Sequence, residues 1–217
     1  MQELIIGLPV LIFSVVLHEV AHGWVARTQG DPTAYMLGRL TLNPIPHIDL
    51  FGSIIVPALM ALLPGGLIFG WAKPVPVNPR NFRNYKRGDI LVSLAGVAAN
   101  FLLVIVFAVV MAAAQWGFAL APGLRPTWEI VAAMGQFGVI INIVLILFNL
   151  VPIPPLDGSH VFAYLLPARW AVRYRQIGFG GMVILLVLLW LPGFSTIIFA
   201  PVEWFYGMAM SLVHFLA

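Results

Sequence analysis

Two histidines and a glutamate near the start of the chain, in the run His18-Glu19-Val20-Ala21-His22, have a spacing that can support chemistry. Residues four apart lie on one face of an α-helix, so His18 and His22 can bind a single metal ion. A glutamate beside the first histidine is typical of zinc hydrolases, where it takes a proton from the attacking water. We therefore predict one Zn²⁺ ion on His18 and His22, with Glu19 as the general base.

The motif follows an apolar run from Leu4 to Leu17. Ionisable residues are costly inside a membrane, and those that occur there are usually functional. The alternative is a pair of buried structural histidines. It would leave the carboxylate of Glu19 buried without a cation, which is strongly destabilising. The surroundings of the motif therefore favour a metal site.

The composition indicates a membrane protein. Of the 217 residues, 61% are hydrophobic and only 9% are charged, proportions that soluble globular domains do not show. The absence of cysteine excludes disulfides and thiolate ligands, so a metal site must use His, Asp, Glu, Asn or the backbone. We expect an all-α polytopic membrane protein that contacts the lipid bilayer and binds no nucleic acid.

The helices that position the motif are expected in the apolar segments of the chain, because a transmembrane helix needs about 20 apolar residues. These segments are Glu3–Ala26, Ile90–Trp116, Trp128–Val151, about Ile177–Leu191, and Phe194–Ala217. We predict a single integral membrane domain over residues 1–217. It would have a three-span catalytic core, about residues 3–175, and one or two further C-terminal spans within about 177–217.

Lysine and arginine are distributed unevenly among the connections between these segments. Ten of the eleven lie either between the first and second segments or between the third and fourth. Cytoplasmic loops are enriched in these residues, so we expect both connections in the cytoplasm and the N-terminus outside. The predicted site would then lie toward the cytoplasmic side of a membrane that we expect to be a prokaryotic plasma membrane.

The connection after the first span contains a further apolar stretch, residues 50–69. A full crossing there would place Arg27 and Arg39 opposite the later basic residues and abolish the charge asymmetry. Prolines and a Gly-Gly pair in this stretch also interrupt helices. We therefore expect a re-entrant or β-like loop on the cytoplasmic side, between spans 1 and 2.

A catalytic zinc usually has three protein ligands and one open position. The third span runs in the same direction as the first and ends in a proline-rich turn, so Asp157 is expected at the depth of His22. A helix N-cap is the alternative role for Asp157. His160, three residues later, could be a fourth ligand, a donor that supports a ligand, or an interfacial residue.

Two motifs in this order resemble the site-2 protease family of intramembrane zinc metalloproteases, and in particular its short members without PDZ or CBS modules. The motifs are His18-Glu19-xx-His22 and Asn149-xx-Pro152-xxx-Leu156-Asp157-Gly158. Three further stretches are similar to that family: Gly30-Asp31-Pro32-Thr33-Ala34, Gly38-Arg39-Leu40-Thr41-Leu42-Asn43-Pro44 and Ser93-Leu94-Ala95-Gly96-Val97-Ala98-Ala99-Asn100. Members usually have proline where this chain has Val97, a position that is not a ligand.

The resemblance implies zinc on His18, His22 and Asp157, with Glu19 as general base and acid. It also implies a zinc-dependent intramembrane endopeptidase. Its substrate would be a single-span transmembrane protein or peptide, such as a membrane-tethered regulator or a remnant signal peptide. Asn100 and Asn149 could then orient the scissile carbonyl or support the oxyanion, although polar residues between membrane helices often only join them.

The run Lys73-Pro74-Val75-Pro76-Val77-Asn78 could hold a substrate that has unwound. In an extended strand, the backbone groups of Val75 and Val77 share one edge, whereas the prolines blunt the other edge. The Val75/Val77 edge could therefore pair with an extended substrate segment. A rigid loop without substrate contact is the alternative.

Two non-proteolytic functions remain as alternatives. Ionisable residues in membrane spans also mark ion pathways, so the chain could be a metal-ion transporter. It could also be a scaffold that keeps a zinc ion without catalysis. A transporter predicts ligand residues at several depths, whereas here they are expected to converge at one.

Overall fold

The computed structural model describes residues 2–61, 70–178, 180–190 and 193–217, and in this part of the chain it has helices and no strands. The elements are α1 (Gln2–Gln29), α2 (Thr33–Met36), η1 (Ile45–His47), η2 (Leu50–Ile55), α3 (Val56–Ala61), η3 (Pro79–Asn81), α4 (Tyr85–Leu120), η4 (Pro122–Leu124), α5 (Arg125–Asn149), α6 (Asp157–Ala163), α7 (Ala168–Gln176), α8 (Gly180–Trp190) and α9 (Phe194–Leu216). The all-α prediction is confirmed for these residues.

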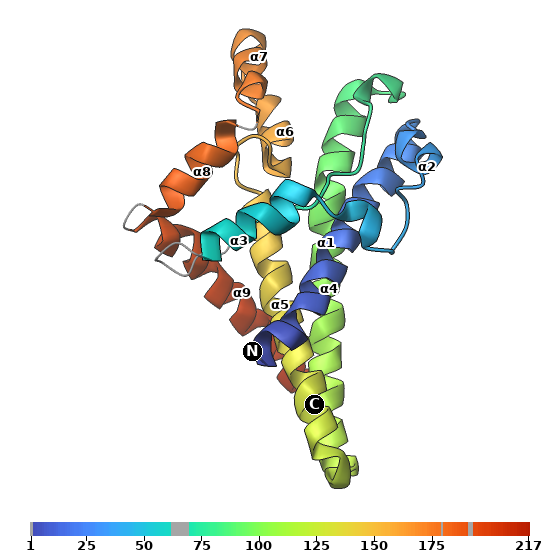
Figure 1. The fold of residues 1–217 in the computed structure, drawn as a ribbon, viewed down its shortest axis with the longest axis vertical. Coiled ribbons are helices and arrows are strands. Elements are labelled where there is room, and N and C mark those ends of the chain that lie inside the picture. The colour runs from blue at the N-terminus through green and yellow to red at the C-terminus, as the bar shows by residue number, and fades with distance from the viewer. Residues whose placement is uncertain (1, 62–69, 179, 191–192) are drawn as a thin grey trace.

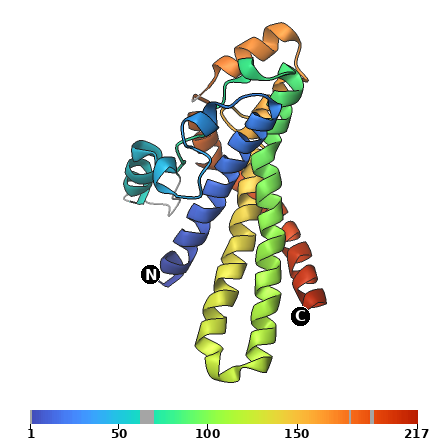
Figure 2. The same ribbon diagram turned by 90° about the vertical axis from the view of Figure 1, so that its right-hand side faces the viewer.

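Three long helices, α1, α4 and α5, form the centre of the molecule (Figure 1). By length and composition, residues 5–29, 85–120 and 122–149 could each cross a membrane, which confirms the three predicted spans. Helices α4 and α5 form a long antiparallel hairpin, and α1 lies beside its upper half (Figure 2). The first and third spans therefore run in the same direction, as the site prediction required.

The boundaries of the spans follow from local chemistry. Helix α1 ends at Gly30, whose φ of +113° is favourable only for glycine. Helix α4 begins after Asn84, whose side chain accepts a hydrogen bond from the backbone N–H of Arg87 at 3.0 Å. The N-terminal turns of α4 lie beside the end of α1, because the backbone N–H of Arg83 donates to the carbonyl of Gln29 at 2.9 Å and Val92 packs in one cluster with Ala26.

Helix α9 covers the α4–α5 hairpin on its other side. Its buried Val213 and Ala209 pack against Val139 and Ile143 of α5 and Ala108 of α4. This cluster is the largest apolar core among the described residues. Whether one or two C-terminal segments cross the membrane remains a prediction.

The apolar stretch at residues 50–69 is helical where the structure describes it, since η2 and α3 cover residues 50–61. Residues 62–69 lie outside the described part. The backbone N–H of Trp71 donates to the carbonyl of Gly52 at 3.0 Å, and Ser53 Oγ donates to the carbonyl of Trp71 at 2.9 Å. The two ends of the stretch therefore lie side by side. No strand is seen in its described residues, and Lys73–Asn78 is extended without a strand partner.

A proline-rich turn connects α5 to α6 and is packed by α8. Leu156 lies in a small apolar core with Met182 and Leu185 of α8. At Gly181 the α8 backbone approaches the carbonyl of Pro154 so closely that a Cβ would overlap it. This packing holds the turn that leads directly into Asp157.

Candidate metal centre

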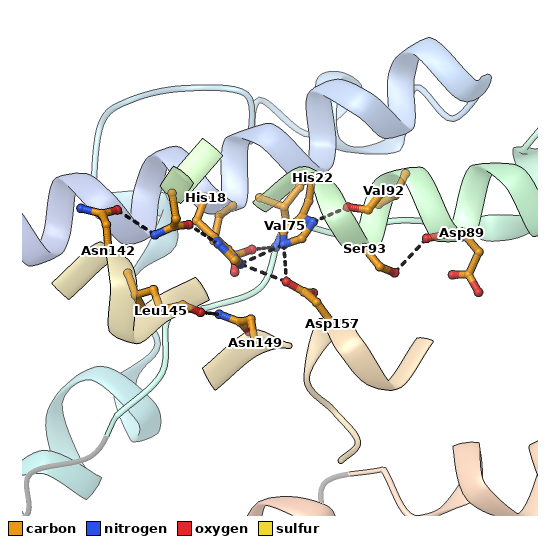
Figure 3. A network of polar contacts seen from close by, with 12 residues as sticks. His18, His22, Val75, Asp89, Val92, Ser93, Asn142, Leu145, Asn149 and Asp157 are labelled. Carbon is orange, nitrogen blue, oxygen red and sulfur yellow. Dashed lines mark hydrogen bonds and ion pairs between the residues drawn. The ribbon is translucent and has the colours of Figure 1, made fainter. Parts of the chain in front are cut away.

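Helix α1 and the start of α6 bring three candidate ligand atoms together. Nε2 of His18 and Nε2 of His22 are 3.0 Å apart, and each is 3.3 Å from Oδ2 of Asp157 (Figure 3). Among the described residues, this is the only group of three or more His, Asp or Glu side chains that could hold a metal ion. The predicted ligand set is thus assembled in space, with the histidines on consecutive turns of α1.

Hydrogen bonds at the other ring nitrogens determine the histidine tautomers. Nδ1 of His22 lies 2.7 Å from the backbone carbonyl of Val92, which can only accept, so this nitrogen carries the proton. Nδ1 of His18 lies 2.6 Å from Oδ1 of Asn100. In both neutral rings Nε2 therefore keeps its lone pair and points into the cluster.

The backbone carbonyl of Gly138 determines how the side-chain amides of Asn142 and Asn100 are oriented next to His18. Asn142 Nδ2 donates to the carbonyl of Gly138 at 2.8 Å and to Ser14 Oγ at 2.9 Å, so its Oδ1 faces Asn100. Asn100 Nδ2 donates to that oxygen at 2.8 Å, which turns its own Oδ1 toward His18. The side chains of Ser14, His18, Asn100 and Asn142 are all buried. The hydrogen bonds between them tie α1, α4 and α5 together.

This geometry fits a cation. Oδ2 of Asp157 is buried and has no hydrogen-bond partner. It faces two imidazole lone pairs, an arrangement that is unfavourable unless a positive charge lies among the three atoms. A set of two nitrogens and one carboxylate oxygen suits Zn²⁺.

Glu19 lies between this cluster and the extended segment at residues 73–78. Its Oε2 accepts a hydrogen bond of 2.7 Å from the backbone N–H of Val75. The side chain of Val75 is buried and approaches α1 at Gly23, where a Cβ would meet it at 2.8 Å. The predicted Val75/Val77 edge is therefore next to the site, but in this structure the Val75 donor is taken by Glu19.

Arg39 and Asp31 hold this extended segment at its two ends. Arg39 Nη2 donates to the carbonyls of Lys73, at 2.9 Å, and Pro74, at 3.3 Å. At the other end, Asp31 Oδ2 accepts the backbone N–H of Asn78 at 2.7 Å. The partners of Arg39 and Asp31 are 34 and 47 positions away along the chain, so these contacts are visible only in the folded structure.

Asp31 is fully buried and acts as a multiple acceptor. Its other oxygen receives the hydroxyl and N–H of Thr33 and the side-chain amide of Asn81. Burial would raise the pKa of Asp31, but the hydrogen bonds from Thr33, Asn78 and Asn81 outweigh it and lower the pKa below its ordinary value.

Gly96 lies where α4 approaches α1, directly beside the two histidines. A Cβ there would be 2.4 Å from Cε1 of His18 and 2.5 Å from Nε2 of His22. Only glycine allows α4 to approach α1 this closely. Its position four residues before Asn100, on the same helix face, was the signal available in the sequence.

The remaining predicted residues are placed as follows. The side chain of Asn149 donates to the carbonyl of Leu145 in its own helix, at 3.0 Å. Asn100 is behind His18, with its amide nitrogen directed at Asn142. His160 is not part of the ligand cluster, because its Nδ1 contacts Asp89 at 3.2 Å. A direct role of Asn100 or Asn149 at the substrate remains a prediction.

Comparison with known proteins agrees with this geometry. Residues 6–189 match peptidase family M50. The chain is similar to "Putative zinc metalloprotease YwhC" of Bacillus subtilis, with 39% identity over 190 residues that cover 84% of this chain and 78% of the relative. It is also similar to "Putative zinc metalloprotease Rip2" of Mycolicibacterium smegmatis, with 29% identity over 206 residues, 91% of this chain and 71% of the relative. No solved structure matches the chain.

Proposed function

The chain belongs to peptidase family M50, the membrane zinc metalloendopeptidases of the site-2 protease type, and on that premise we propose that it cleaves an unwound transmembrane segment of a membrane-bound substrate. The observation that carries the proposal is the convergence of His18, His22 and Asp157 within 3.3 Å of one another, with Glu19 next to His18 in α1. The three would hold one Zn²⁺ ion, and Glu19 would be the group that moves protons.

Zinc bound there supplies Lewis acidity and an activated water. The residues of the chain supply the rest. Asn100 and the Val92 carbonyl hold the imidazoles of His18 and His22 with Nε2 directed inward. The carboxylate of Glu19 accepts a proton from the attacking water and returns it to the leaving amine.

The extended segment at residues 73–78 would present the substrate. Its backbone is held by Arg39 at one end and by Asp31 at the other. A substrate strand that pairs with the Val75/Val77 edge would take the Val75 N–H from Glu19, and the freed carboxylate would then be available for proton transfer.

Proline at position 75 tests this role. Val75→Pro removes the N–H and should strongly reduce cleavage while zinc remains bound, because no ligand changes. Val77→Ala, which keeps every backbone donor, is the matched control. Cleavage by Val75→Pro at the wild-type rate would exclude pairing at this edge.

The orientation proposed for the chain has the metal centre toward the cytoplasm and the N-terminus outside. It is supported by the ten of eleven basic residues on one side of the three-span arrangement. The hydrogen bonds between Trp71 and the Gly52–Ser53 pair support a re-entrant stretch at residues 50–69, because a full crossing would separate its ends by about 30 Å.

The decisive experiment separates the protease from a transporter or a zinc scaffold. Glu19→Gln should retain zinc but lose cleavage of a single-span model substrate in detergent or liposomes. Glu129→Gln, which removes an exposed carboxylate paired with Arg125, is the control and should change neither property. Cleavage that survives in Glu19→Gln would refute the proposed chemistry.

A further inference from the structure

A second buried carboxylate, Asp89, lies in the first turns of α4, and its side chain is only 6% exposed. Three donors converge on it. The hydroxyl of Tyr164 is 2.8 Å from Oδ2, Nη2 of Arg175 is 3.3 Å from the same oxygen, and Nδ1 of His160 is 3.2 Å from Oδ1. The proposed mechanism uses none of these side chains.

All three donors lie within residues 157–176, which comprise α6 and α7 and which we call the arm. The arm begins with Asp157, the third candidate metal ligand. Asp157 is the first residue of α6, and His160 and Tyr164 follow three and seven residues later. These spacings place them along one helix face. Two contacts on one face, at different heights, fix both the rotation and the axial position of a helix as short as α6.

Helix α4 brings this contact into register with the rest of the centre. Asp89, Val92, Gly96 and Asn100 are spaced by three, four and four residues and share one stripe of the helix. Val92 and Asn100 hold the two histidines, and Gly96 gives them space. The same stripe therefore contacts α1, through the histidines, and α6, through Asp89.

The donors are suited to a permanent contact. Partial burial and the Asp89 carboxylate raise the pKa of Tyr164 to about 12, so its hydroxyl keeps its proton at neutral pH. The guanidinium of Arg175 lies 4.9 Å above the Tyr164 ring and also donates to the hydroxyl of Tyr85 at 3.1 Å. Loss of the carboxylate would leave several of these donors without an acceptor.

We propose that Asp89 is a positioning residue that holds α6 in the rotation at which Asp157 reaches His18 and His22. The inference rests on the proposed function only in taking Asp157 as a metal ligand. The contact itself joins protein groups only.

Two variants and one control test the proposal. Asp89→Asn removes the charge and gives a donor to one of the two oxygen positions, and Tyr164→Phe removes one hydrogen bond while keeping the ring. Tyr85→Phe is the matched control, because its hydroxyl contacts Arg175 but not Asp89 or α6. If Asp89→Asn fails to fold, Tyr164→Phe and its comparison with Tyr85→Phe still decide.

Hydrogen–deuterium exchange in the metal-free protein reports the arm directly. Amides of residues 157–164 should exchange faster in Asp89→Asn and Tyr164→Phe, whereas amides in the α4–α5 hairpin should not change. Global acceleration, or none in α6, would overturn the proposal. Wild-type rates are expected in Tyr85→Phe.

The coordination of the metal can be followed by visible absorption spectroscopy with Co²⁺ in place of zinc. The visible absorption of Co²⁺ should differ from wild type in Asp89→Asn, and the metal should transfer to a chelator about tenfold faster or more, as for other groups that orient ligands. An unchanged spectrum in both variants would overturn the proposal. A wild-type protein that binds no metal would instead refute the proposed function, and the exchange result would still decide the role of Asp89.

Discussion

Replacing Gly96 by alanine should disrupt the metal centre while leaving α4 helical. An added Cβ would be 2.4 Å from Cε1 of His18 and 2.5 Å from Nε2 of His22, whereas ordinary contact begins at 3.4 Å. The imidazoles or α4 must therefore move by about 1 Å, as in an overpacked core. Both histidines are hydrogen-bonded through Nδ1, His18 to Asn100 and His22 to the carbonyl of Val92. Such a movement breaks these hydrogen bonds, which direct Nε2 toward the metal site.

Two opposing effects determine how much Gly96→Ala changes the free energy of unfolding. Alanine is about 1 kcal/mol more favourable than glycine inside a helix, whereas overpacking costs about 1–3 kcal/mol. The free energy of unfolding of the metal-free protein should therefore fall by no more than about 2 kcal/mol. A displacement of about 1 Å in a catalytic constellation, in contrast, costs on the order of 100-fold in rate.

Gly207→Ala is the control, because Gly207 lies in α9 and a Cβ there would meet nothing within 4 Å. Both variants are purified in parallel, and bound zinc, thermal unfolding and cleavage of a single-span substrate are measured. Gly207→Ala should match or exceed wild-type stability with full zinc and activity. If Gly96→Ala binds zinc and cleaves like wild type, the close approach of α4 to the histidines is not required.

Three other perturbations have defined outcomes. Asn142→Leu leaves the Asn100 amide without its acceptor, and it should cost about 1–3 kcal/mol in unfolding and weaken zinc retention, measured by chelator competition. Asp31→Asn sets a donor against the N–H of Asn78 and should be destabilising at neutral pH. Because the pKa of Asp31 is lowered in the fold, the wild-type advantage should be complete above pH 4 and shrink as the pH falls through that lowered pKa, measured by thermal unfolding at each pH. Chelation should lower the melting temperature of wild type, because zinc stabilises only the folded state, but not that of His22→Ala.

The candidate ligand residues could be predicted from the sequence because each depends on a short-range rule or on topology. His18 and His22 follow from helical periodicity. Asp157 follows from the shared direction of the first and third spans, which apolar length and charge placement define. The family likeness then agreed with the same three residues, and the structure brings them within 3.3 Å of one another.

The groups that support these ligands could not be predicted, because their partners are distant in sequence. Asn142 contacts Ser14 across 128 positions, and Asp31 contacts Asn78 across 47. The hydrogen bond from Val75 to Glu19 spans 56 positions and could not be predicted either, because the sequence does not show which acceptor meets an exposed backbone N–H. Local patterns identify a polar residue in an apolar helix but not the residue that it faces after folding.

The stripe on α4 has a consequence for how the sequence can vary. Each residue added to a helix rotates everything beyond it by about 100°. An insertion or deletion between Asp89 and Asn100 would therefore direct one end of the stripe away from its partners and separate the α6 contact from the histidine contacts. Length changes are far easier to accommodate in the loop before α4 or at the α4–α5 turn. Among natural variants, the interval from Asp89 to Asn100 should thus be constant in length even where the side chains within it differ.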